Sequence, residues 1–170
     1  MAETAKMIET KLKAYRIIHL IMVISSVVYG VMIVYIDQYA PIPPTITDVQ
    51  TLTTIEYMLI FTLLSLIAIT VLVRKEMLGS DKIFKKRATA KKLSEQPPFI
   101  ANYLSSLFVV WSLIEAIAIS GIVLFLVSGK LMMPLTLISI AVFFKLFNGP
   151  RREELTELAS KHRDLTCGVV

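Results

Sequence analysis

Residues 100–127 read IANYLSSLFVVWSLIEAIAISGIVLFLV, and one acidic side chain, that of Glu115, interrupts an otherwise uncharged stretch. An α-helix rises about 1.5 Å per residue, so a stretch of this length crosses the roughly 30 Å hydrocarbon layer of a bilayer. Three further apolar stretches, each with at most one charged side chain, lie at about residues 17–36, 55–73 and 131–147. The sequence therefore predicts an all-α membrane protein in which residues 1–170 form a single membrane domain with four transmembrane helices.

The composition agrees with a membrane protein. Of the 170 residues, 55% are hydrophobic and the mean hydropathy is +0.70, which is more apolar than a soluble domain of this size can bury in one core. The net charge of +5 comes from basic residues at the ends of the apolar stretches, without interleaved aromatic residues, so we expect no nucleic-acid partner. We expect a multi-pass protein surrounded by lipids, in the cytoplasmic membrane if the protein is bacterial.

Lysine and arginine residues fall almost entirely on one side of the predicted spans. They gather in the arm before residue 17, in the loop of residues 74–99 and in the tail after residue 148, whereas the other side carries Lys130 and a proline-rich loop, residues 37–48, without a basic residue. Short cytoplasmic loops are enriched in such residues, so we predict that both termini are cytoplasmic. The basic loop is expected to contain a short helix, Lys82–Leu93, and the tail a helix at about residues 150–165.

Two pairs of short segments hint at an internal duplication. Residues 29–34 resemble residues 120–125, and residues 74–78 after the second span resemble residues 151–155 after the fourth. Two copies of a helical hairpin would produce both matches. Each match is also short enough to arise by chance in an apolar chain, so both explanations remain open.

Glu115 is the strongest candidate for a functional residue. Of the thirteen acidic residues it alone lies deep in an apolar span. A charge at the centre of a transmembrane helix costs roughly 2.5–3.5 kcal/mol on insertion scales, and an acid avoids most of this cost by carrying a proton. The first hypothesis is therefore that Glu115 is a proton-binding group.

Lys145 provides an alternative. If the third and fourth spans form an antiparallel pair that turns near Gly129-Lys130, residues whose numbers sum to about 260 lie at the same depth, and Glu115 and Lys145 meet this condition. An ion pair would keep the carboxylate charged and lock two helices together. A third option is that Glu115 faces a polar group of a partner subunit.

The segment around Glu115 resembles the polar loop and second helix of the c subunit, or proteolipid, of rotary ATP synthases. The shared features are Gln96-Pro97, a carboxylate nineteen residues after Gln96, and the small and apolar residues that follow it up to Val123. In that family the carboxylate binds the transported ion. The resemblance thus implies ion binding at Glu115, and it implies a proton because Ala116 stands where sodium-binding members usually carry a hydroxyl group.

The chain departs from that family in two features: residues 58–73 contain no glycine, and Glu95 stands in place of the family's arginine. The predicted function is a proteolipid-like membrane subunit of a larger assembly with Glu115 as a proton-binding group. The alternative is a non-catalytic scaffold or accessory subunit of a membrane complex, in which Glu115 and Lys145 form a structural pair. Both hypotheses predict that other membrane subunits or further copies of the chain are partners. Neither hypothesis predicts an active site within this chain.

Other candidate residues are weaker, and we expect no cofactor and no metal site. His19 lies in the first span while the other histidine, His162, lies in the tail, so the chain offers no pair of histidines for a haem. Cys167 is the single cysteine and has no partner for a disulfide or a metal site. Ser25 and Ser26 are expected to support close helix packing.

Overall fold

The computed structural model describes residues 2–79 and 98–167, and these residues form helices joined by short connections, with no strand among them. The helices are α1 (Ala2–Tyr39), α2 (Val49–Gly79), α4 (Pro98–Ser128), α5 (Met132–Phe147) and α6 (Arg152–Cys167). The predicted all-α fold is confirmed. The predicted helix Lys82–Leu93 lies outside the described residues.

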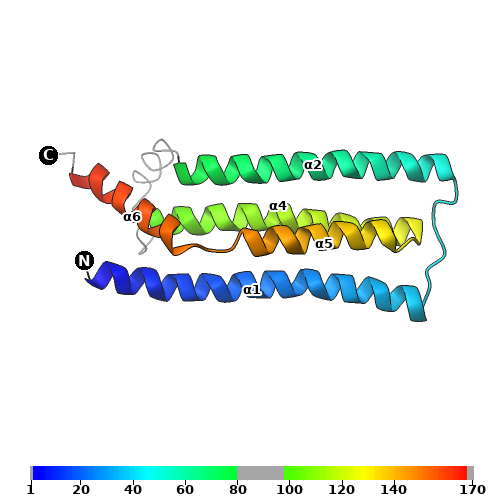
Figure 1. Ribbon diagram of the computed structural model, residues 1–170, viewed down its shortest axis with the longest axis horizontal. Helices are drawn as coiled ribbons and strands as arrows, with labels where there is room; N and C mark the ends of the chain where they lie inside the picture. Colours follow the sequence, from blue (N-terminus) through cyan, green and yellow to red (C-terminus); the bar gives the residue numbers. More distant parts are fainter. Residues whose placement is uncertain (1, 80–97, 168–170) are drawn as a thin grey trace.

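The long helices α1, α2 and α4 and the shorter α5 run side by side, and α4 and α5 form the middle of the bundle (Figure 1). α1 packs mainly against α5 and α4, and α2 packs mainly against α4. Both ends of the chain lie at the same end of the bundle, next to α6 (Figure 1). α1 and α2 lie on opposite sides of the central pair, so they do not repeat the packing of α4 against α5 that a duplicated hairpin would produce.

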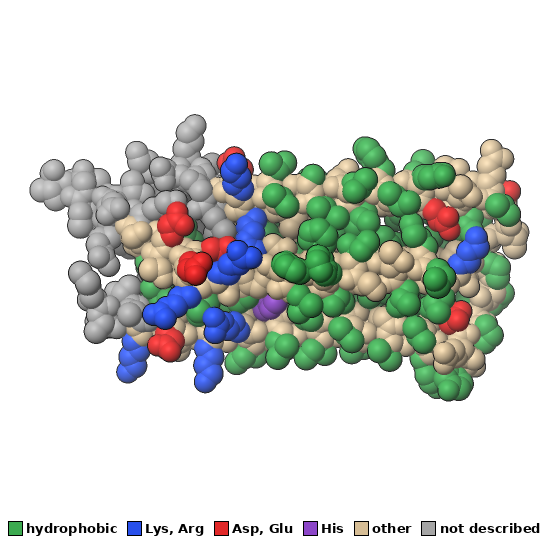
Figure 2. Space-filling view, in the orientation of Figure 1, with side chains coloured by type: hydrophobic (Ala, Val, Ile, Leu, Met, Phe, Trp, Pro, Cys, Tyr) green, Lys and Arg blue, Asp and Glu red, His purple; other side chains and the backbone are tan. Residues whose placement is uncertain are grey.

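Three helices are long and apolar enough to cross a membrane: Lys6–Tyr39, Val49–Glu76 and Phe99–Ser128. A fourth span results if α5 and the first part of α6 are taken together across their bend of 51°. α5 alone has 16 residues, which is short for a bilayer. Hydrophobic side chains cover the middle of the bundle, and most charged side chains lie toward the end that carries the termini (Figure 2). The described residues are thus compatible with a multi-pass membrane protein.

α4 and α5 approach each other closely at Gly121. A Cβ atom at this position would lie 2.9 Å from the backbone oxygen of Pro134 and 3.0 Å from the Ile138 side chain. The absence of a side chain therefore lets the two backbones approach closely. The turn between these helices contains Gly129 in the left-handed conformation, with φ of +63°, which only glycine adopts without strain.

Hydrogen bonds hold the connection between α1 and α2 at two points. The backbone N–H of Thr45 donates to the carbonyl oxygen of Val127 at 3.0 Å, which ties the connection to the end of α4. Asp48 caps α2, because its carboxylate accepts hydrogen bonds from the Thr51 backbone N–H at 2.8 Å and from the Thr51 hydroxyl. These two bonds favour the ionised carboxylate and lower the pKa of Asp48 below its ordinary value.

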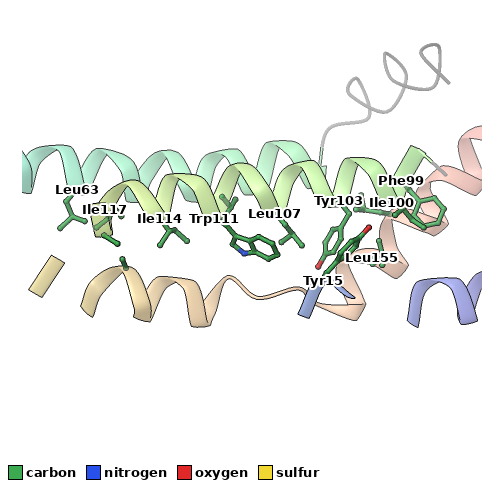
Figure 3. Packing of buried hydrophobic residues seen from close by; sticks show 14 of the residues in the cluster. Tyr15, Leu63, Phe99, Ile100, Tyr103, Leu107, Trp111, Ile114, Ile117 and Leu155 are labelled. Carbon is green, nitrogen blue, oxygen red and sulfur yellow. The ribbon is translucent and has the colours of Figure 1, made fainter. Parts of the chain in front are cut away.

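The hydrophobic core is built around the first two thirds of α4. Side chains from α1, α2, α5 and α6 surround this helix, so the core runs from the end with the termini into the middle of the bundle (Figure 3). Its largest fully buried residues on α4 are Trp111, Tyr103, Ile100, Leu107 and Ile114. α4 is therefore the helix that positions any group in the interior.

Candidate functional site

The structure brings Glu115 and Lys145 together. The tight turn at Gly129-Lys130 makes α4 and α5 antiparallel neighbours, and the Lys145 Nζ atom forms an ion pair with Glu115 Oε2. The Lys145 side chain is completely buried, whereas the Glu115 side chain keeps 16% of its surface exposed. The lysine thus points into the bundle and does not extend to the membrane surface.

The Lys145 ammonium group is saturated with hydrogen bonds. It donates to Glu115 Oε2, to the Ser26 hydroxyl at 2.6 Å and to the backbone oxygen of Met22 at 2.8 Å. An ammonium group has three N–H bonds, so each of them has an acceptor. Two of the acceptors belong to α1, and the cluster therefore joins α1, α4 and α5 at one depth.

The sequence did not predict the contribution of α1 to this cluster. Ser26 was expected to support helix packing, and the structure shows that its hydroxyl is a ligand of the buried ammonium. Tyr29, the next residue on this face of α1, is partly buried and packs against both core clusters. Met22, Ser26 and Tyr29 are spaced four and three residues apart, which places them on one helical face, and this spacing is the signal that could have revealed them.

The break between α5 and α6 lies just beyond the cluster, and side chains from other helices cap it. The last carbonyl groups of a helix have no partner within the helix. The His19 ring bonds to the backbone oxygen of Lys145 at 2.8 Å, and the Trp111 indole N–H donates to the backbone oxygen of Asn148 at 3.1 Å. Both rings lie against each other, with centroids 5.4 Å apart. His19 is therefore a cap of α5 from α1.

A second ion pair holds α6 against the bundle. Arg74 on α2 donates to Glu154 at 2.6 Å and to the side-chain oxygen of Asn148 at 2.6 Å. The Tyr103 hydroxyl donates to the second oxygen of Glu154 at 3.2 Å and accepts from the Arg151 backbone N–H at 2.7 Å. Residues from α2 and α4 thus fix both the break and the start of α6.

At this site, the positive charge of Lys145 compensates the negative charge of Glu115. The acid at mid-span forms an ion pair with Lys145, and in residues 2–79 and 98–167 no three side chains of the metal-binding types come together. The fold and the site together define an all-helical protein, compatible with several membrane crossings, whose interior holds a buried ion pair. Comparisons of the chain with protein-family models, with curated proteins and with solved structures found no match.

Proposed function

We propose that this protein is a non-catalytic scaffold or accessory subunit of a membrane complex, in which the Glu115–Lys145 pair locks α1, α4 and α5 together. The observation that carries this proposal is the state of Lys145, whose side chain is completely buried with an acceptor for every N–H bond. Each of these acceptors stabilises the buried ammonium group, because removing any of them leaves an N–H bond of Lys145 without a partner.

Proton binding at Glu115, in a proteolipid-like subunit, is the second candidate function. One observation favours it: the Glu115 side chain keeps 16% of its surface exposed although its partner keeps none. Against it stands the ion pair itself, because the Lys145 ammonium group already contacts the Glu115 carboxylate. A proton carrier would have to separate this pair in each cycle, which makes the structural role the better supported one.

Partners of the proposed subunit would bind along the membrane-facing helices. Two apolar grooves flank α5 and support this idea. One, of about 470 Å³, lies between α1 and α5 beside Gly30, and the other, of about 650 Å³, lies between α2 and α5 beside Phe143. Lipid chains, helices of other subunits or further copies of the chain are the proposed occupants.

We further propose four membrane crossings with both termini in the cytoplasm. Single cysteines at Thr47 and Glu153, introduced after Cys167→Ser, test this arrangement. A membrane-impermeant maleimide should label Thr47→Cys in intact cells and Glu153→Cys only after the membrane is permeabilised, because the two positions lie at opposite ends of the bundle. Both positions are exposed, so a lack of reaction reports the membrane and not burial. The reverse labelling pattern would contradict the topology.

The two candidate functions differ in how Glu115 should react with a hydrophobic carbodiimide, which modifies protonated carboxyl groups within membranes. If the pair is structural, wild-type Glu115 should stay unlabelled, and Lys145→Met should increase its labelling because the acid then loses its counter-ion and takes up a proton. Peptide mapping by mass spectrometry identifies the labelled residue, and Glu115→Gln serves as the control. Efficient labelling of the wild-type residue would support the proton-binding function instead.

A further inference from the structure

A line of polar groups runs along α1 from the end with the termini to the ion pair. Tyr15, His19, Met22, Ser26 and Tyr29 are spaced by four, three, four and three residues, which places them on one face of the helix. This face lies against α4 and α5: Tyr15 contacts Tyr103, His19 contacts Trp111, and Ser26 contacts Lys145. Polar side chains of α1 therefore contact α4 or α5 at three successive positions along the bundle, those of Tyr15, His19 and Ser26.

The end of this line nearest the termini lies close to a partly exposed carboxylate, that of Glu154. The Glu154 carboxylate is 20% exposed and accepts a hydrogen bond from the Tyr103 hydroxyl. The ring of Tyr103 lies beside that of Tyr15, with centroids 6.2 Å apart, and both rings are close to Leu155 of α6 (Figure 3). The Tyr103 side chain thus lies between Tyr15 and a partly exposed carboxylate.

Within this line of polar groups, the Tyr15 hydroxyl has no hydrogen-bond partner among the described residues. Tyr15 is only 4% exposed, and its hydroxyl is the one buried side-chain N or O atom without a hydrogen-bond partner in the described part of the chain. Buried polar groups of this kind are nearly always paired with protein groups or with ordered water. One turn further along α1, the His19 Nε2 atom must donate to the Lys145 carbonyl oxygen, so in the neutral ring the Nδ1 atom is an acceptor.

The line of polar groups stops beyond the ion pair. On the far side of the cluster, α1, α4 and α5 meet in a second core group made of the fully buried Ile33, Phe125 and Ile138. These side chains offer no hydrogen-bonding group, so water has no partner there. On this face of α1, polar groups lie toward the end with the termini, and apolar side chains lie toward the other end.

We propose that ordered water binds at the Tyr15 hydroxyl and links it to His19, so that the polar face of α1 is hydrated from the end with the termini up to the Glu115–Lys145 pair. Water is the ligand that fits, because the Tyr15 hydroxyl can both donate and accept a hydrogen bond and the Nδ1 atom of the neutral His19 ring can accept one, while the rings around them are aromatic. Beyond the pair, the apolar group of Ile33, Phe125 and Ile138 blocks the passage of water. This inference holds whether the pair locks the helices or binds a proton.

Transfer of polarisation from water protons to the protein, measured by solid-state NMR on the full chain in lipid bilayers, tests this proposal. The Tyr15 ring carbon that bears the hydroxyl and the His19 ring nitrogens should gain polarisation severalfold faster than the side chains of Ile33 and Phe125. Difference spectra against Tyr15→Phe assign the Tyr15 signal. If Tyr15 gains polarisation as slowly as Ile33, the hydrated site does not exist.

The Tyr15→Phe variant also tests the link to His19. It removes only an oxygen atom without a protein partner among the described residues, so the fold should persist, which circular dichroism and the melting temperature verify. The transfer rate at His19 should fall by a factor of about two or more, because the water loses one of its partners. Tyr35→Phe, at an exposed position near the other end of α1, is the matched control and should leave His19 unchanged. An unchanged rate at His19 in Tyr15→Phe would overturn the water link.

Discussion

Lys145→Met is expected to lower the free energy of unfolding by about 3–5 kcal/mol, the typical effect of removing one partner of a well-buried ion pair. The methionine fills a similar volume, so the loss comes from the broken ion pair, after which Glu115 takes up a proton, and from the unfilled acceptors on α1, Ser26 Oγ and the Met22 carbonyl oxygen. Unfolding of the purified protein in mixed micelles with increasing denaturing detergent measures this change. Lys130→Met, at an exposed position in the turn between α4 and α5, is the control and should have little effect.

Glu115→Gln should also destabilise the protein, because it leaves the buried ammonium group of Lys145 without a counter-ion. The double variant, with Gln at position 115 and Met at position 145, should recover much of the loss, since neither charge then remains in the interior. The recovery is the interaction energy of the pair in a double-mutant cycle. Stable single variants that lose a proton-dependent activity would contradict the structural role and support proton binding.

Gly121→Ala is expected to be the next most damaging change, with a loss of about 1–3 kcal/mol from overpacking. The added methyl group would meet the backbone oxygen of Pro134 at 2.9 Å, and a backbone atom cannot move aside as a side chain does. α4 and α5 would have to separate, although alanine favours the helix over glycine by about 1 kcal/mol. The same unfolding titration measures the loss, and disulfide crosslinking between cysteines on α4 and α5 reports the separation.

Gly30→Ala is the matched control for this prediction. Gly30 also lies within a span and also faces α5, but a Cβ atom there would lie 3.6 Å from the nearest side-chain atom, on Ile138, which is an ordinary contact. This substitution should be neutral or stabilising, by up to about 1 kcal/mol from the helix propensity of alanine. Equal losses in the two variants would show that the close approach at Gly121 does not limit the packing of α4 on α5.

Several features could be predicted from the sequence because they depend on local properties. The length of the uncharged stretches predicted the helices, since backbone groups in lipid must be paired within the segment. The tail helix was predicted at about residues 150–165 and is found at Arg152–Cys167, because Asn148-Gly149-Pro150 interrupts helical structure locally. The common depth of Glu115 and Lys145 followed from the tight turn at Gly129-Lys130, which fixes the register of an antiparallel pair.

The tertiary structure decided which side chains face one another, because this depends on the rotation of each helix about its axis and on the order in which the helices pack. Nothing in the local sequence places α1 beside α5 and α2 on the opposite side, so the roles of Ser26 and Met22 as ligands of Lys145 could not be predicted. The caps of α5 from His19 and Trp111 likewise join residues far apart in the chain. The sequence determined that charged side chains lie within apolar helices, whereas the packing of α1 determined how the charge of Lys145 is satisfied, since two of its three acceptors come from a helix more than a hundred residues away.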